Sequence, residues 1–195
     1  MRTYEEKARK EGFSVVAGLD EAGRGPLAGP VVAAAVVLPD DYIDSRITDS
    51  KKLSPKKRAS LYETIYRDAV TVGIGIVDAV EIDRINILQA SLLAMAMAVE
   101  NLYPQPDFLL IDGTFTIPRP LPQTAIVKGD SASISIAAAS IIAKVTRDNL
   151  MDRYSIDYPQ FGFSQHKGYP TKEHRAAILR YGPTFFHRAS FTVRA

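Results

Sequence analysis

Short runs of apolar residues alternate along the chain with longer amphipathic segments, and this alternation predicts both strands and helices. Five runs have the length and the branched side chains that strands favour, and each is followed by a proline or a charged residue. The predicted strands cover residues 15–19, 31–38, 70–77, 107–111 and 124–127. A glycine-rich stretch separates the first two, which predicts a turn between neighbouring strands.

Helical spacing of apolar residues predicts three long helices, over residues 55–68, 87–102 and 133–154. Ser54 is a suitable N-cap for the first of them, and Pro55 suits its first position. A short helix is predicted from residue 78 or 79, and a last one is capped by Thr171 and ends at Gly182. The prolines of residues 114–123 exclude regular structure there.

The order of these elements predicts an α/β fold. Two strands come first, and helices and strands then alternate, which favours a mixed sheet with helices on its faces. A length of 195 residues suits one domain, and no repeat, low-complexity segment or linker divides the chain. We therefore expect a single domain over residues 1–195, with a smaller helical part from about residue 160 onward.

Carboxylates follow three of the predicted strands, as Asp20-Glu21, Asp112 and Asp130. Because strands of one sheet can bring their ends together, these acids can form one site. Oxygen ligands in a chain without cysteine suit Mg²⁺ or Mn²⁺ better than zinc. Adjacent residues face opposite sides of a regular strand, so a common site for Asp20 and Glu21 predicts a break at the following glycines. For this acidic pair alone, the alternative is a solvated polar turn.

An ordered set of motifs covers nearly the whole chain. LDEAGRGPLAGPVVAAAVVL occupies residues 19–38, TDSKKLS residues 48–54, LLIDG residues 109–113 and KGD residues 128–130. SISIAAASIIAKVTRD follows at residues 133–148 and HKGYPT at residues 166–171. A lone DE-x-G-x-G would be a weak signal, but the ordered set is specific. In these motifs the chain resembles the ribonuclease HII family.

The resemblance implies a ribonuclease H-like fold, with a mixed five-stranded sheet flanked by helices and a small helical C-terminal extension. It implies an endoribonuclease that hydrolyses the RNA strand of RNA–DNA hybrids and cuts 5′ of single ribonucleotides embedded in duplex DNA. The ends left are 3′-hydroxyl and 5′-phosphate. The catalytic, metal-binding acids implied are Asp20, Glu21, Asp112 and Asp130, the last of them directly or through water. Four such carboxylates can hold two Mg²⁺ or Mn²⁺ ions about 4 Å apart.

Ribose recognition is a further implication of the resemblance. The family detects an RNA–DNA junction with a Gly-Arg-Gly motif and a tyrosine, which match Gly23, Arg24, Gly25 and Tyr169. Peptide groups beside glycine can contact a 2′-hydroxyl, and the tyrosine ring would stack on the next sugar. Candidates for backbone-phosphate contacts are Lys51, Lys52, Lys144 and Lys167, with Ser140 on the predicted helix face of Lys144. Their alternative is a solvated surface.

The net charge of +2 is too small to predict a nucleic-acid partner, but the C-terminal part is basic. Beyond residue 163, one acid, Glu173, stands against Lys167, Lys172, Arg175, Arg180, Arg188 and Arg194. This part either contacts phosphates or forms a solvated basic surface. The histidines, His166, His174 and His187, fit no zinc motif, and we interpret them as surface or phosphate-adjacent residues.

The first residues are polar and charged, unlike a signal peptide, and no apolar stretch is long enough to span a membrane. The lack of cysteine fits a reducing compartment. We therefore expect a cytoplasmic monomer that binds nucleic acid and no membrane. The sequence leaves a contact with a replication clamp undecided.

Two other functions are compatible with parts of this pattern. A hybrid-binding protein without activity would gain nothing from four acids facing phosphates. A junction resolvase on the same fold would cut branched DNA and would not need a ribose sensor. Arg24 and the short N-terminal segment favour the HII type over the related HIII type, which usually has lysine in the glycine motif and an extra N-terminal domain.

Overall fold

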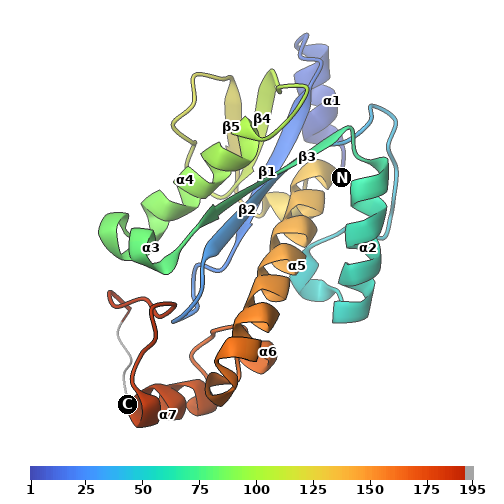
Figure 1. Ribbon diagram of the computed structural model, residues 1–195. Helices are drawn as coiled ribbons and strands as arrows, with labels where there is room; N and C mark the ends of the chain where they lie inside the picture. Colours follow the sequence, from blue (N-terminus) through green and yellow to red (C-terminus); the bar gives the residue numbers. More distant parts are fainter. Residues whose placement is uncertain (192–195) are drawn as a thin grey trace.

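A five-stranded sheet lies at the centre of the protein in the computed structural model, which describes residues 1–191 (Figure 1). The strands are β1 (Val16–Ala22), β2 (Val31–Val37), β3 (Thr71–Val77), β4 (Phe108–Asp112) and β5 (Gln123–Ile126). Their order across the sheet is β3-β2-β1-β4-β5. The pairs β1–β2 and β2–β3 are antiparallel, whereas β4 is parallel to both β1 and β5. The predicted mixed α/β sheet is therefore confirmed.

Helices cover both faces of this sheet (Figure 1). On one face lie α3 (Ala79–Ile85) and α4 (Ile87–Glu100), and on the other lie α2 (Pro55–Asp68) and α5 (Ile134–Asp157). The smaller elements are α1 (Thr3–Lys10), η1 (Ser50–Lys52), η2 (Gly129–Ser131), η3 (Pro159–Phe161), α6 (Phe163–His166) and α7 (Lys172–Tyr181). Of these, α1 lies in a segment for which the apolar pattern predicts no element, and it packs against β1 and β4.

Strand β2 shows how the core is divided. All seven of its residues are buried, because helices cover it on both sides. Ala33 and Ala35 pack in the cluster under α4, whereas Ala34 and Val36 pack in the cluster under α2 and α5. Small side chains keep both layers close to the sheet. At Gly75 of β3, an added Cβ would lie 1.9 Å from the carbonyl oxygen of Ala94 in α4.

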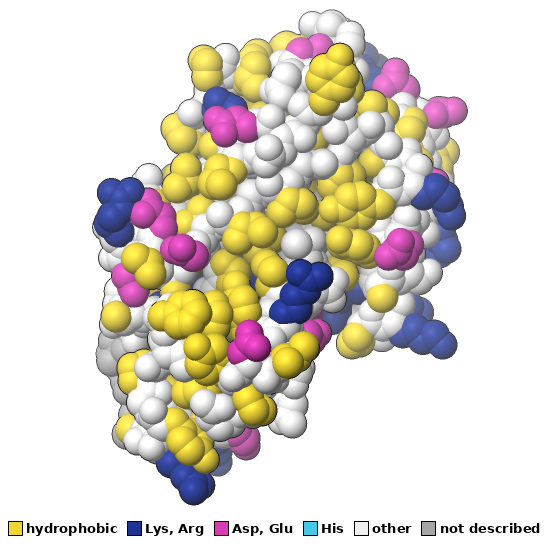
Figure 2. Space-filling view, in the orientation of Figure 1, with side chains coloured by type: hydrophobic (Ala, Val, Ile, Leu, Met, Phe, Trp, Pro, Cys, Tyr) yellow, Lys and Arg dark blue, Asp and Glu magenta, His cyan; other side chains and the backbone are white. Residues whose placement is uncertain are grey.

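Helix α5 connects the sheet to the C-terminal part of the chain. Its first half is buried against β1 and β2, and its second half extends past the sheet toward α6 and α7 (Figure 1). A separate apolar cluster forms there around Met151, Phe161 and Phe163. Basic and acidic side chains are interspersed on the face seen in Figure 2, with several Lys and Arg along the edge formed by α2. No helix within residues 1–191 has the length and apolar character needed to cross a membrane.

Candidate active site

Two parallel strands bring the first pair of acids together. Residues Leu19 of β1 and Ile111 of β4 are paired in register, so Asp20 and Asp112 follow at the same edge of the sheet. The Asp20 side chain is buried, and its Oδ1 accepts a hydrogen bond from the Glu21 backbone N–H at 2.7 Å. The parallel arrangement of strand ends therefore provides the clustering that the sequence predicts for these two carboxylates.

The strand runs through both acids without a break and ends directly before Gly23, the first of the glycines at which the break was predicted. Within it, Asp20 and Glu21 pair with Ala34 and Ala33 of β2. The two acids therefore leave opposite faces of β1. Both still line one cavity, because the cavity lies at the end of the sheet, where β4 has stopped and β1 continues.

Asp130 reaches the same region through a tight turn. The Gly129 N–H donates to Asp112 Oδ1 at 2.7 Å, which fixes the turn to the end of β4. A Cβ at Gly129 would lie 2.6 Å from the Ile136 side chain and 3.3 Å from Asp112 Oδ1, so glycine permits the close approach. Asp130 is buried, and its Oδ2 lies 3.9 Å from Lys51 Nζ.

The acids repel one another in a poorly solvated site. Burial raises the pKa of Asp20 well above its ordinary value, and the charges of Glu21 and Asp112 raise it further. Burial also raises the pKa of Asp130, with a contribution from the charge of Asp112. Burial raises the pKa of Glu21 too, although the Arg24 guanidinium opposes this from 3.3 Å. Negative charge at this site is therefore only partly compensated by the protein.

A cavity of about 210 Å³ joins these acids to most of the predicted substrate-binding residues. Asp20, Glu21 and Asp112 line it. So do Gly23, Arg24, Gly25, Lys51, Ser140, Lys144 and Tyr169. Segments far apart in the sequence, from β1, η1, β4, α5 and the loop before α7, thus meet around one space. Asp130 lies next to this set through its contact with Lys51.

The donor chemistry of the cavity fits a divalent cation. Within residues 1–191, no three His, Asp or Glu side chains are already gathered as a metal site. The buried carboxylates around the cavity nevertheless provide hard oxygen donors, and their mutual repulsion would be relieved by a bound cation. The residues therefore fit Mg²⁺ or Mn²⁺ in their chemistry.

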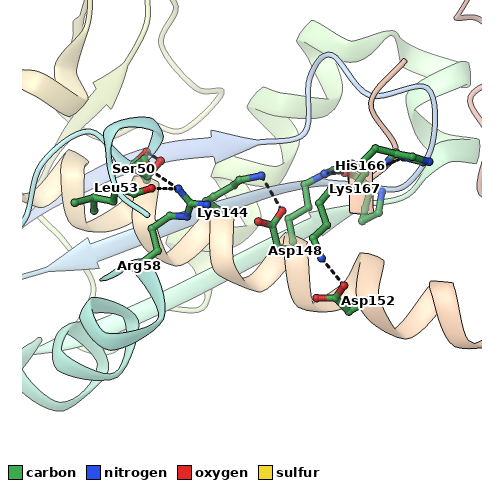
Figure 3. A network of polar contacts seen from close by, with 12 residues as sticks. Ser50, Leu53, Arg58, Lys144, Asp148, Asp152, His166 and Lys167 are labelled. Carbon is green, nitrogen blue, oxygen red and sulfur yellow. Dashed lines mark hydrogen bonds and ion pairs between the residues drawn. The ribbon is translucent and has the colours of Figure 1, made fainter. Parts of the chain in front are cut away.

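A second hollow, of about 570 Å³, adjoins the cavity and shares Lys144 and Tyr169 with it. It lies between α2 and α5 and extends to α6 (Figure 3). Its lysines face acids: Lys144 Nζ lies 2.8 Å from Asp148 Oδ1, and Lys167 pairs with Asp152. We call this hollow the α2–α5 groove. Lys167 therefore belongs to the groove, and Lys52 lines neither space.

Two residues around the site are absent from the predicted set, although Ser50 lies inside the TDSKKLS motif; Arg58 lies outside every quoted motif. Buried Ser50 lines the cavity, and its hydroxyl lies 2.9 Å from that of Ser140. Arg58 Nη1 donates to the carbonyls of Ser50 and Leu53 at 2.8 and 2.5 Å (Figure 3). The arginine therefore holds η1, which carries Lys51, against α2.

The interpretation of His174, His187 and Arg188 as surface or phosphate-contacting residues is wrong, whereas His166 is half-buried and lines the α2–α5 groove. His174 is fully buried, and His187 and Arg188 are 9% and 2% exposed. Charged and imidazole side chains can be buried where backbone groups satisfy their hydrogen bonds, and Arg188 donates only to backbone carbonyls among the described residues. Arg194 of the same basic set lies outside the described residues.

Stability is expected to fall in acid because of His187. Burial, together with the nearby His174, lowers the pKa of His187 from 6.5 to about 4. Below pH 6.5 the unfolded chain therefore binds a proton at His187 more readily than the folded chain does. The free energy of unfolding should fall by roughly 2 kcal/mol between pH 6.5 and 4 on this account.

Urea unfolding of the native protein and of His187→Gln, measured across this pH range, tests the assignment. The variant should show a shallower fall in the free energy of unfolding, because it lacks the titrating imidazole. Equal slopes for the two proteins would show that His187 does not carry this pH dependence.

Comparison with known proteins gives one consistent result. A family model described as Ribonuclease HII matches residues 17–194. A ribonuclease HII from Syntrophus aciditrophicus (strain SB) is 55% identical over 195 residues, covering 100% of this chain and 92% of that protein. A ribonuclease HII from Bacillus subtilis (strain 168) is 54% identical over 191 residues, covering 98% of this chain and 74% of that protein.

Solved structures agree with the fold. The ribonuclease H2 from Pyrococcus horikoshii OT3 is similar with a TM-score of 0.77 and 27% identity, over 92% of this chain and 95% of its own. A chain of a PCNA:RNase HII complex from Archaeoglobus fulgidus is similar with a TM-score of 0.75 and 26% identity. The match covers 93% of this chain and 97% of that chain. Bst-RNase HIII in complex with Mn²⁺ is similar with a TM-score of 0.72 and 19% identity, over 95% of this chain and 70% of its own. This match supports the fold alone.

Proposed function

The chain belongs to the ribonuclease HII family, and from this we propose that it cuts 5′ of single ribonucleotides embedded in duplex DNA. As a ribonuclease H, it acts on the RNA strand of RNA–DNA hybrids. The observation that carries the proposal is the shared cavity, where the acids meet the Gly23-Arg24-Gly25 loop and Tyr169. A scissile phosphate and the ribose beside it would thus contact one continuous surface. The products would carry 3′-hydroxyl and 5′-phosphate ends.

Enzymes of this family depend on divalent metal ions, and we propose that Asp20, Glu21, Asp112 and Asp130 hold two of them, either Mg²⁺ or Mn²⁺. When bound, such ions supply a more acidic attacking water and stabilise negative charge on the reacting phosphate and the leaving oxygen. The backbone donors of Glu21 and Gly129 orient the Asp20 and Asp112 carboxylates before any ion arrives. Asp130 could contribute directly or through a water molecule.

Basic residues at the rim would contact the nucleic-acid backbone. Lys51 and Lys144 line the cavity, and Lys144 also lines the α2–α5 groove together with Lys167. Both groove lysines face an aspartate, so binding a phosphate would exchange one anionic partner for another. Ser140 and Lys144 are one helical turn apart on α5, which agrees with their proposed common role. Lys52 would contribute only at longer range.

Ribose recognition would use the narrow space between the loop and the tyrosine. A Cβ at Gly25 would lie 3.8 Å from Tyr169 Cε1, so the loop and the ring face each other directly. Peptide groups of the loop can both donate to and accept from a 2′-hydroxyl, whereas the ring can stack on a sugar that lacks it. Together they would distinguish the RNA side of a junction from its DNA side.

Gly25→Ala is expected to lower cutting at an embedded ribonucleotide about tenfold, since displacing a reacting group by a fraction of an ångström carries penalties of this size. The added methyl would occupy the space between the loop and Tyr169. Single-turnover cleavage of a duplex with one ribonucleotide measures the effect. The thermal unfolding midpoint serves as the control and should stay close to native, because nothing else lies within 4 Å of the new Cβ. An unchanged cleavage rate would contradict the role given to this space.

The proposed reaction is tested with a labelled duplex that carries one ribonucleotide, incubated with Mg²⁺, Mn²⁺ or EDTA. Cutting 5′ of the ribonucleotide that EDTA abolishes is the expected result. An all-DNA duplex should remain intact. Cutting of an all-DNA branched junction would favour a resolvase instead. If a folded preparation cuts only long hybrids, the ribonuclease H assignment stands and the proposed junction recognition is wrong.

We also keep two predictions from the sequence, a monomeric state and a cytoplasmic location. Gel filtration with light scattering of the full chain measures the first. Cell fractionation measures the second.

A further inference from the structure

The peptide groups of the Gly23-Arg24-Gly25 loop are held from behind by one buried arginine. Arg188 Nη2 donates to the Gly23 carbonyl at 2.6 Å, and its Nη1 donates to the Arg24 carbonyl at 3.1 Å. Its Nε and Nη2 also donate to the Gly29 carbonyl at 3.0 and 2.8 Å. The side chain is 2% exposed, and within residues 1–191 it forms no ion pair. Its charge is thus used to orient backbone.

Fixing these carbonyls also fixes the opposite side of each peptide group. A trans peptide is planar, and its N–H points away from its C=O. With the Gly23 and Arg24 carbonyls turned toward Arg188, the N–H groups of Arg24 and Gly25 point away from it. Neither N–H has a protein acceptor among the described residues. They are therefore two oriented donors at the lining of the cavity, available to a ligand oxygen.

Tyr169 is held by a chain of two histidines. The Thr184 N–H donates to His187 Nδ1 at 2.9 Å, which leaves the proton of a neutral His187 on Nε2. That Nε2 lies 3.1 Å from His174 Nε2. His174 Nδ1 lies 2.9 Å from the Tyr169 carbonyl, which can only accept. Each step thus has one donor and one acceptor, running from His187 through His174 to Tyr169.

His187 and Arg188 are consecutive residues, so both supports come from one short segment. This segment is itself anchored at both sides. His187 forms a bridge with Ala28, and the Arg188 N–H donates to the Leu27 carbonyl at 2.8 Å. Beyond it, the backbone N–H groups of Ala189 and Ser190 donate to Asp83 at 2.7 and 2.9 Å. One anchored segment therefore contacts the loop directly through Arg188 and reaches the Tyr169 backbone indirectly, through the contact of His187 with His174.

We propose that Arg188 and His187 are positioning residues for ribose recognition: Arg188 orients the peptide groups of Gly23-Arg24-Gly25, and His187, acting through His174, sets the backbone of Tyr169. The inference rests on the proposed function, since it assigns the support of the same site. Neither residue touches the substrate. They affect how strongly the enzyme prefers an RNA–DNA junction over a uniform RNA–DNA hybrid, because they fix the distance between the Gly23-Arg24-Gly25 loop and the Tyr169 ring.

The test measures two cleavage rates with one protein preparation: that of a duplex with a single embedded ribonucleotide and that of a uniform RNA–DNA hybrid. The ratio of the two rates is the readout. Partial unfolding lowers both rates together and cancels in the ratio. The native protein is measured first. If it does not cut at the embedded ribonucleotide, the proposed function fails, and this is distinguishable from failure of the positioning role.

Arg188→Lys keeps the positive charge but cannot reach three carbonyls with a planar fork. We expect its ratio to fall about tenfold, in the range that small misplacements of a bound group produce. An unchanged ratio, whatever happens to the two separate rates, would overturn the role of Arg188.

The histidine chain is tested with a matched pair of variants. His187→Gln retains an N–H donor near the position of Nε2, whereas His187→Leu has none, and both lose the imidazole ring. We expect the Gln variant to keep a ratio within about threefold of native and the Leu variant to lose about tenfold. Equal ratios for the two variants would show that the hydrogen bond to His174 does not position Tyr169. This pair tests the His187 part of the proposal independently of whether Arg188→Lys folds.

Discussion

Asp20→Asn should cut a duplex with one embedded ribonucleotide at least about a thousandfold more slowly than the native protein, the size of loss expected when a main electrostatic contributor is removed. Asp20 is the most buried of the four proposed acids and interacts with both Glu21 and Asp112. Asparagine keeps the size and the hydrogen bond from the Glu21 N–H, but it removes the charge that would hold a cation. The loss should therefore be in the chemical step.

Binding separates this role from a structural one. An acid that faces a phosphate repels it, so Asp20→Asn should bind the duplex at least as tightly as the native protein, as measured by fluorescence anisotropy in EDTA. Asp41→Asn, an exposed acid outside the site, is the matched control and should change neither rate nor affinity. Cutting by Asp20→Asn within tenfold of native would contradict the catalytic role. Loss of binding together with cutting would instead favour a structural role for the carboxylate.

The positions of the strands and of the acids could be predicted because both depend on local patterns. A buried strand ends where polar residues follow its apolar run, and the ends of parallel strands lie at one edge of the sheet. Asp20 and Asp112 follow such runs directly. The argument that a common site for Asp20 and Glu21 needs a break in the strand was wrong, because it assumed that both acids must leave one face. A site at the end of a sheet accepts side chains from either face.

The buried supports could not be predicted because nothing local distinguishes them. Arg188 and Lys172 are alike as basic residues of a basic segment, yet the first is buried and the second is exposed. The difference is set by the loop at Gly23 to Gly29, more than 150 residues away, whose carbonyls satisfy the guanidinium. The interior position of His174 likewise depends on partners from two other segments. Such burial becomes visible only when the tertiary contacts are known.

Gly18→Ala is expected to reduce the free energy of unfolding by about 3 kcal/mol, at the upper end of the usual cost of overpacking. An added Cβ would lie 2.2 Å from the Ser135 carbonyl carbon, 2.3 Å from the Ile136 nitrogen and 2.6 Å from the Ser135 Cβ. All three atoms belong to the first turn of α5, and two of them are backbone. No side-chain rotation can relieve these contacts, so the helix must move away from β1.

Movement of α5 would also alter the site, because this helix carries Ser140 and Lys144 to the cavity that Asp20 lines. Folded Gly18→Ala protein should therefore lose activity on embedded ribonucleotides and uniform hybrids alike. Urea unfolding measures the stability, with Gly25→Ala as the control, since its new Cβ has one neighbour, at 3.8 Å. A free energy of unfolding within about 1 kcal/mol of native for Gly18→Ala would contradict the close packing of β1 against α5. Loss on both substrates is expected because Gly18 sets the distance between two layers of the fold, whereas Gly25 shapes only the loop proposed to recognise the embedded ribonucleotide.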